Sequence, residues 1–208
     1  ERDLQNLTFR GSQTNGKIML DDVQLKTPLA NVNVSGSLGL DSTVDLKYSL
    51  ETKDFPLLRK YMGADSLFKD TMNLKLLFDG SINGSMNRVS TRGHLTLKNF
   101  IYSSIRIDSL QFNYFVNDVT PNDFKNKLDF KKADSAILGG LSLYTHHVNM
   151  NGGTLSNLTA SVTKEKNKTL FEISGTQDSL NAFANVKGSL ILENEKKGEI
   201  FLDNLFLR

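Results

Sequence analysis

A short frame, Gly-x-(Leu/Ile)-x-Leu, recurs along this chain of 208 residues and constrains its fold more than any other feature. Its copies begin at Gly16, Gly36, Gly93, Gly139, Gly188 and Gly198. An apolar residue at every second position is typical of a β-strand with one apolar face and one polar face. A leading glycine fits a turn, a bulge or a close backbone approach where the strand begins. The sequence therefore predicts an array of strands that share one apolar face.

The copies are related as repeats. The segment Val34-Ser35-Gly36-Ser37-Leu38-Gly39-Leu40 matches Val186-Lys187-Gly188-Ser189-Leu190-Ile191-Leu192 except at its second and sixth positions. The copies at Gly36, Gly93, Gly139 and Gly188 are spaced by about fifty residues, within the range of repeat architectures. Because the spacing is loose, a meander of antiparallel strands fits better than a solenoid with identical rungs. We expect fifteen or more short strands.

Two kinds of punctuation interrupt the alternation. The apolar phase slips by one residue across three pairs of polar residues, Asp21-Asp22, Lys98-Asn99 and Asp203-Asn204. Either a tight turn or a β-bulge explains such a slip. Strong signals for two-residue hairpin turns, which need positive φ, occur at Asn15-Gly16, Asn83-Gly84 and Asn151-Gly152.

One short helical insert is expected near residues 54–69. Asp54 is a candidate N-cap, Pro56 falls in the first turn, and Gly63 is a stop signal. We expect the insert to lie across the end of the sheet. A polar stretch at 119–127, which contains Pro121, is a candidate boundary between internal repeats. Residues 1–208 are otherwise interpreted as a single repetitive β segment, cut from a longer chain because both ends are abrupt.

The composition excludes several classes of function. The chain has 25 basic and 23 acidic residues with the signs interleaved, so it lacks the concentrated basic surface of nucleic-acid-binding proteins. It has no cysteine, which excludes disulfides and thiolate metal sites. No apolar run approaches the ~20 residues of a transmembrane helix. A hydrophobic content of 38% is that of a folded domain rather than a disordered chain.

The sequence predicts no enzyme, no metal site and no cofactor. Of its histidines, His146 and His147 are adjacent, and in a regular strand they would point to opposite faces and could not chelate one metal together. No Walker, dinucleotide-binding or Gly-x-Ser-x-Gly frame occurs between a strand and a helix. The carboxylates are scattered at strand ends, where Asp and Asn serve turns.

The positive signal is apolar surface. An antiparallel sheet with one apolar face must cover that face with another sheet, a helix or a ligand. Helical residues are scarce, so the sheet either folds on itself as a sandwich with a packed core or curls into a trough with an accessible lining. Uneven turn spacing and the small residues Gly39, Ala182 and Ala184 at lining positions favour the trough.

The unit "Gly-x-Leu-x-Leu, polar pair, apolar-x-apolar" resembles the repeats of the TamB and AsmA-like proteins of diderm bacterial envelopes. The closing residues 186–207 are similar too, since they carry the frame at Gly188 and again at Gly198, where Asp203-Asn204 and Leu205-Phe206-Leu207 complete the unit. Residues 46–58, with a strand followed by Asp54-Phe55-Pro56, are similar to that family's strand followed by a short helical insert. Residues 78–85, with Gly93-His94-Leu95-Thr96-Leu97 after them, are also similar. The resemblance extends over nearly the whole chain.

The resemblance implies a mostly β fold, an elongated antiparallel β-taco or groove related to bridge-like lipid-transfer proteins. It implies binding and transfer of phospholipid between the inner and outer membranes, with a role in outer-membrane protein assembly as a further expectation. It places the protein in the periplasm, held to the inner membrane by an N-terminal anchor outside this sequence. Its implied partners are phospholipid acyl chains and an outer-membrane barrel protein of the Omp85 type, with no nucleic acid.

The mechanism expected from such a groove is physical. Acyl chains lie along the apolar lining while head groups stay in water at the open edge, and each buried CH₂ contributes ~0.8 kcal/mol. The residues expected to face lipid are Val34, Leu38, Leu40, Leu46, Leu50, Leu76, Phe78, Leu95, Leu97, Leu110, Phe112, Leu141, Leu143, Phe171, Ile173, Val186, Leu190, Leu192, Ile200 and Leu202.

Two other functions fit the same pattern. A structural or adhesive β-repeat with a closed sandwich core would have a packed interior and no extractable lipid. A chaperone-like groove would receive outer-membrane β-strands at its open edge, and crosslinks would then map to backbone edges rather than to the apolar lining.

Overall fold

The computed structural model describes residues 6–57, 74–102, 104–120, 138–150, 153–165, 168–177, 180–194 and 197–208. Almost all of them lie in strands, which confirms the predicted fold class of an elongated antiparallel sheet. The strands are β1 (Asn6–Thr14), β2 (Lys17–Lys26), β3 (Ala30–Gly39), β4 (Thr43–Thr52), β5 (Lys75–Ser85), β6 (Arg88–Tyr102), β7 (Ile105–Val119), β8 (Leu138–Met150), β9 (Gly153–Glu165), β10 (Lys168–Gln177), β11 (Ala182–Asn194) and β12 (Lys197–Leu207).

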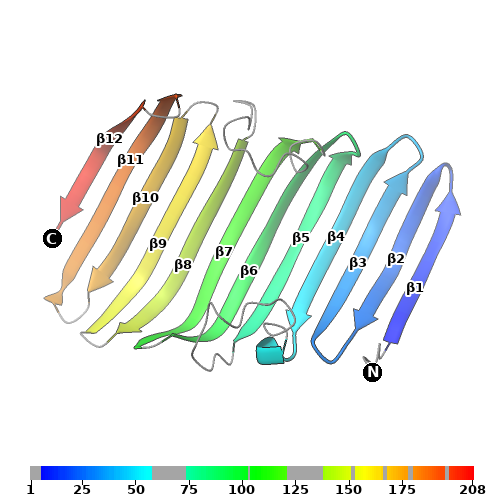
Figure 1. Ribbon diagram of the computed structural model, residues 1–208, viewed down its shortest axis with the longest axis horizontal. Coiled ribbons are helices and arrows are strands. Elements are labelled where there is room, and N and C mark those ends of the chain that lie inside the picture. Colours follow the sequence, from blue (N-terminus) through cyan, green and yellow to red (C-terminus); the bar gives the residue numbers. More distant parts are fainter. Residues whose placement is uncertain are drawn as a thin grey trace.

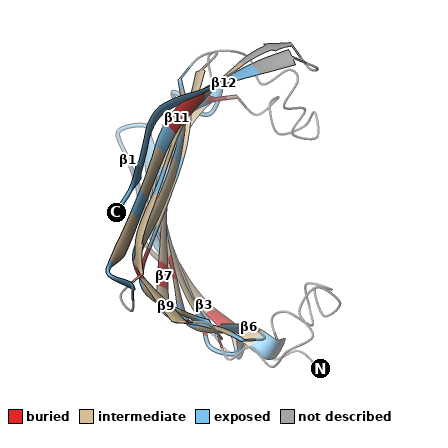
Figure 2. Cartoon of the chain, turned by 90° about the vertical axis from the view of Figure 1, so that its left-hand side faces the viewer, coloured by how far each residue is buried: buried red, intermediate tan, exposed pale blue. Residues whose placement is uncertain are grey.

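The twelve strands form one open sheet in sequence order, from β1 at one edge to β12 at the other (Figure 1). Every pairing is antiparallel and joins neighbours in the sequence. Viewed from its side, the sheet is one layer thick and bent along its strands into a C (Figure 2). In the described part of the chain no second sheet faces this layer, so the described residues do not form a sandwich.

The three phase slips lie within strands and are not turns; those in β2 and β12 are bulges, whereas at Lys98-Asn99 the pairing of β6 with β7 keeps its register. Asp21-Asp22 lies inside β2, where the pairing with β3 shifts between Leu20 and Val23. Lys98-Asn99 lies inside β6, and Asp203-Asn204 lies inside β12, where the register shifts against Lys187 and Gly188. A bulge lets two successive polar residues pass without reversing the chain. The strands are therefore longer than expected, and the described residues form twelve of them where fifteen or more were expected in the chain.

The hairpin signals had different outcomes. Asn15-Gly16 forms the predicted turn between β1 and β2, with φ of 50° and 72°. The prediction at Asn83-Gly84 is wrong, because both residues lie inside β5 and the chain turns after Ser85. Gly84 has φ of 133°, and a Cβ there would lie 2.4 Å from the Arg88 carbonyl oxygen. This glycine therefore serves a close strand approach rather than a turn. Asn151-Gly152 lies outside the described residues.

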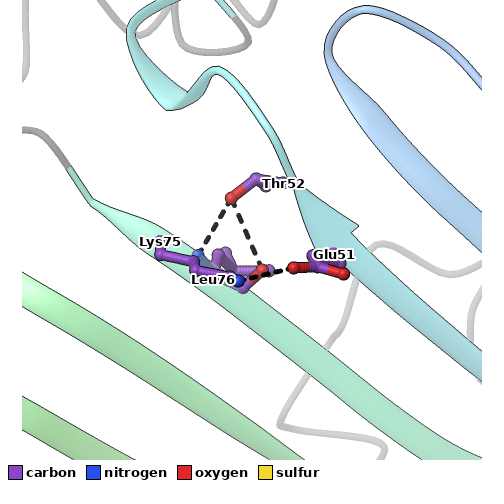
Figure 3. A network of polar contacts seen from close by, with 4 residues as sticks. All are labelled: Glu51, Thr52, Lys75 and Leu76. Carbon is purple, nitrogen blue, oxygen red and sulfur yellow. Dashed lines mark hydrogen bonds and ion pairs between the residues drawn. The ribbon is translucent and has the colours of Figure 1, made fainter.

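The insert between β4 and β5 begins as predicted. Asp54 caps a helical turn at 55–57, because its Oδ1 accepts a hydrogen bond of 2.9 Å from the Leu57 amide. The rest of the predicted helix, 58–69, lies outside the described residues. At the end of β4, the Thr52 hydroxyl accepts a hydrogen bond from the Leu76 amide (2.9 Å) and donates one to the Leu76 carbonyl (3.4 Å) (Figure 3). Thr52 thus extends the β4–β5 pairing by one residue.

The expected repeat boundary does not divide the sheet. Of residues 119–127, only Val119 and Thr120 are described, and β7 pairs directly with β8 across the intervening segment. The sheet is continuous from β1 to β12.

Candidate functional site

The strand register gathers the apolar residues on one face of the sheet. Residues directly opposite each other in antiparallel strands point to the same face. Starting from Val34, the pairings connect one row across ten strands: Tyr48, Gly80, Gly93, Tyr114, Leu141, Val162, Phe171, Gly188 and Leu202. Alternation from this row defines the apolar face, and the other side of the sheet is the polar face.

The register places the predicted lining residues together. All of them that lie in strands fall on the apolar face, although Leu192 is described only by its backbone pairing with Gly198. Leu40 lies just beyond β3 and is 68% exposed. The prediction omitted many residues of the same face, including Leu7, Ile18, Val23 and Leu207, although they show the same alternation. Their contact with lipid stays a prediction.

The apolar face is the concave one. In Figure 1, β3 runs upward with β2 on its right, and the Ala30 carbonyl accepts a hydrogen bond of 2.9 Å from Thr27 on that side. When a strand of L-residues runs upward, a residue whose N–H and C=O point to the right has its side chain directed toward the viewer. Ala30 and the apolar face therefore look out of the page. The turn to Figure 2 brings this front to the right, which is the open side of the C.

The opposite edge of the sheet also indicates that the apolar face is the concave one. Phe183 exchanges hydrogen bonds of 2.9 and 3.0 Å with Arg208, at the end of β12. β12 lies to the left of the upward strand β11 (Figure 1). The Phe183 backbone groups therefore point left, and by the same rule of L-residues the side chain belongs to the polar face, away from the viewer. Its partner Thr176 is likewise off the apolar face.

The concave face is accessible within the described part of the chain. Leu141, Val162 and Ile173 are 50%, 47% and 50% exposed although they lie in interior strands. The best-packed region of this face is the cluster of Ile107, Leu110 and Val148. An interior strand whose large apolar side chains stay half exposed needs a ligand or a partner to cover them.

Charge is nearly absent from the concave face. At its alternating positions the described strands carry one charged residue, Lys164. Lys164 lies next to the last residue of β9, so it is at the rim of the trough rather than on its floor. The polar face, in contrast, carries Lys47, Asp79 and Arg92 along adjacent strands. This division suits a ligand that is apolar along most of its length and anionic at one end.

Small residues hollow out the concave face near the C-terminal edge. A depression of about 450 Å³ lies between β9 and β12. Its floor includes Gly175, Ala182 and Ala184, while Leu158, Ile173 and Val186 form its sides. Of the small residues expected at lining positions, Ala182 and Ala184 thus lie in a depression of the lining, whereas the expectation for Gly39 is wrong, because Gly39 lies opposite Lys17 on the polar face.

A hydroxyl cluster lies at the centre of the concave face, and the sequence did not predict it. The Tyr48 and Tyr114 hydroxyls contact each other, and Thr91 Oγ1 lies 3.4 Å from both. Phe78 lies between the rings, with centroids 5.4 Å from Tyr48 and 5.9 Å from Tyr114. Burial raises the pKa of Tyr114 above its usual value. The cluster satisfies its own hydroxyls inside an otherwise apolar lining.

The tyrosines can meet because two glycines lie beneath them. In the row Tyr48–Gly80–Gly93–Tyr114, a Cβ on Gly80 would lie 2.5 Å from the Tyr48 hydroxyl, and one on Gly93 would lie 2.6 Å from Tyr114 Cε1. Each of these positions requires glycine for a close approach.

Along one line across four strands the pairing is interrupted without a shift of register. Lys98-Asn99, Asp108-Ser109, His146-His147 and Ser156-Asn157 lie side by side in β6, β7, β8 and β9. The expectation that His146 and His147 point to opposite faces is wrong, since their ring centroids are 4.2 Å apart. Both rings contact β9. His146 Nδ1 lies 2.7 Å from Asn157 Oδ1, and His147 Nδ1 lies 3.0 Å from Ser156 Oγ.

Other sites are sparse on the polar face. A shallow depression of about 600 Å³ lies there over Gly80 and Gly93, lined by Lys47, Asp79 and Arg92 among others. It is open, and it lies on the opposite side of the sheet from the predicted lining. Among the described residues no group of three or more His, Asp or Glu side chains is placed to hold a metal ion.

The comparisons with known proteins add no relative. No family model, curated protein or solved structure matches this chain. In the part of the chain that the structure describes, no helix has the length and apolar character needed to cross a membrane.

Proposed function

We propose that this protein binds phospholipid by its acyl chains along the concave face and transfers it between membranes. The observation that carries the proposal is a one-layer sheet whose concave face is apolar over twelve strands and uncovered in the described residues. A closed sandwich would bury that face against a second layer. An acyl chain supplies the missing cover, and each CH₂ removed from water contributes ~0.8 kcal/mol.

The distribution of charge supports a lipid that slides rather than one held in a discrete site. Apolar side chains continue from strand to strand across the concave face, so an acyl chain meets a similar surface at each step. Lys164 at the rim is placed to meet a phosphate that stays in water. Lipid transfer therefore requires no conformational change in the sheet itself.

The setting of the proposal comes from the resemblance to TamB and AsmA-like proteins. By that resemblance we infer a periplasmic location and an inner-membrane anchor outside this sequence. A barrel protein of the Omp85 type in the outer membrane is then the partner that receives the lipid.

A lipid-transfer assay with matched variants tests the proposal. Val162→Asp and Ile173→Asp each place a carboxylate on a half-exposed part of the concave face, so the fold should tolerate them. Thr163→Asp places the same charge on the polar face beside Val162. We expect the two concave variants to slow transfer of a fluorescent phospholipid between vesicles by at least ~10-fold, because a carboxylate against an acyl chain costs more than ~1.4 kcal/mol.

The control variant should transfer lipid at the wild-type rate, and circular dichroism should give the same strand content for all chains. Native mass spectrometry of the gently extracted protein provides the second measurement, in which co-purified phospholipid is expected. Equal transfer by all variants, or a protein that never carries lipid, contradicts the proposal.

A further inference from the structure

Tyr48, Thr91 and Tyr114 bring three hydroxyls together on the concave face, and an apolar groove for acyl chains does not require them. Each side chain is half-buried, and each comes from an interior strand of the sheet, β4, β6 or β7. A hydroxyl that is removed from water needs a hydrogen-bond partner, so a lining that only covers acyl chains does better without one. Three hydroxyls in this place suit a ligand that is itself polar at one point.

The sheet is shaped to bring these hydroxyls together. Three strand spacings, about 14 Å, separate the backbones of Tyr48 and Tyr114. Their side chains reach over Gly80 and Gly93, where a Cβ would lie 2.5 Å from the Tyr48 hydroxyl oxygen and 2.7 Å from the Tyr114 hydroxyl oxygen. A larger residue at either glycine would fill the space that the hydroxyls occupy.

The three hydroxyls are held unequally. Those of Tyr48 and Tyr114 contact each other, whereas Thr91 Oγ1 lies 3.4 Å from both. Hydrogen bonds between two hydroxyls are most often about 2.7–2.8 Å long, so both contacts of Thr91 are weak. The Thr91 hydroxyl can therefore turn to another oxygen on the concave side without the loss of a strong hydrogen bond.

The surroundings of the cluster are apolar along the strands. Leu46 and Leu50 flank Tyr48 on the same face, and Phe112 flanks Tyr114. A ligand with a polar group at the cluster thus contacts apolar side chains on either side of that group. This arrangement fits an acyl chain with a hydroxyl part-way along its length. It does not fit a head group, which needs water around it.

The bonding capacity of the cluster favours a hydroxyl over a carbonyl. A hydroxyl donates one hydrogen bond and accepts another, so it joins the three hydroxyls and leaves no donor among the four unused. A carbonyl oxygen only accepts, so it takes a donor from the cluster and offers none in return. The ester groups of an ordinary phospholipid are therefore the poorer partners.

We propose that the cluster of Tyr48, Thr91 and Tyr114 binds a hydroxyl group on the acyl chain of a lipid, so that the concave face prefers lipids with a hydroxylated chain. This inference rests on the proposed function, since it assigns a substrate class to the same face. Over most of the lining an acyl hydroxyl would lie against aliphatic and phenyl side chains without a partner, which lowers its affinity by about tenfold. At the cluster that loss is removed.

Competition between two lipids tests the preference. The delipidated protein is incubated with vesicles that hold equal amounts of a stearoyl phosphatidylcholine and a hydroxystearoyl phosphatidylcholine with its hydroxyl in the middle of the chain. Native mass spectrometry then measures the ratio of the two lipids bound. A variant with both Tyr48→Phe and Tyr114→Phe keeps the rings and removes the phenol hydroxyls. We expect the ratio of hydroxylated to plain lipid to be about tenfold higher for the wild type than for this variant.

Tyr144→Phe is the matched control, because it removes a phenol hydroxyl from the polar face, where Tyr144 is 38% exposed. Its lipid ratio should equal that of the wild type. Thr91→Val removes only the loosely held hydroxyl and should lower the ratio by itself. This second variant tests the same inference if circular dichroism shows that the phenylalanine variant has lost strand content.

The possible results distinguish this inference from the proposed function. Bound lipid with the same ratio in the wild type and in every variant overturns the preference and leaves lipid binding in place. A wild-type protein that binds neither lipid overturns both.

Discussion

Glycine at positions 80 and 93 leaves the space in which the Tyr48 and Tyr114 side chains meet on the concave face. Gly93→Ala would put a Cβ 2.6 Å from both the Asp79 carbonyl oxygen and Tyr114 Cε1, so the backbone must shift. Overpacking of this kind costs about 1–3 kcal/mol, and urea unfolding of the variant should show that loss. Gly139→Ala is the matched control, because its Cβ would approach nothing closer than 3.2 Å. Equal stability of the two variants would contradict the close approach.

Tyr114 provides a test by pH. Burial raises its pKa above the usual 10.0, with the Tyr48 hydroxyl as a smaller cause. A raised pKa in the folded state means that folding favours the protonated phenol. This contribution to stability is complete below pH 10 and is lost as the pH rises through the higher folded-state value. Difference absorbance between the wild type and Tyr114→Phe should show one tyrosinate that forms later than the others. Titration of that tyrosine at or below its usual pKa would argue against its burial.

At the scale of elements, the β4–β5 junction depends on one hydroxyl. Thr52 is 4% exposed, and its side chain bonds both backbone groups of Leu76. Thr52→Val keeps the shape but leaves the Leu76 amide without this partner, which should cost about 1–3 kcal/mol of unfolding free energy. Thr52→Ser keeps the hydroxyl and should retain most of the wild-type free energy of unfolding.

The adjacent ion pair Lys75–Glu51, at 2.6 Å, is half exposed, so Lys75→Met should change the free energy of unfolding by less than ~1 kcal/mol.

The bulge in β2 allows a sharper test. Leu20 and Val23 lie on the same face because β2 has one more residue here than its neighbours. Deleting Asp22 makes the strand regular and leaves Val23 and Leu25 on the concave face, so the chain should still fold. Deleting both Asp21 and Asp22 moves those two side chains to the polar face and should destabilise the protein far more. Thermal unfolding of the two deletions separates a bulge from a turn, since a turn would tolerate neither.

The sequence predicts the faces of the elements better than their ends. A period of two assigns Val34, Leu95 and Leu190 to one face without any knowledge of the fold. The same period cannot say whether the chain reverses at a polar pair, because a bulge and a tight turn both restore the apolar phase. The hydroxyl cluster was missed for another reason. Tyr48 and Tyr114 meet only because the register aligns them with Gly80 and Gly93, and that alignment is a property of four strands.

At the scale of the molecule, the alternation predicts an apolar side, and the uneven turn spacing and small residues favour a trough lined by it, but neither says where along the strands the sheet bends. Curvature arises from twist and bulges summed over many strands. The interruptions of pairing at Asn99, at Asp108-Ser109, at His146-His147 and at Asn157 form one line across β6 to β9. Such a line bends neighbouring strands at the same level, which is what a C-shaped profile requires (Figure 2).

An open sheet in sequence order also has a distinctive stability. Each strand pairs only with its neighbours in the chain, so the free energy of unfolding is a sum of neighbour terms, as in repeat proteins. A chain that begins at Lys17 lacks β1 and loses one pairing out of eleven. It should fold with the same strand content per residue by circular dichroism. Ser142→Pro, in β8 between two paired neighbours, should cost ~3 kcal/mol or more and divide unfolding into two transitions. A fold with a single closed core would instead lose both halves together, in one transition, whichever strand was changed.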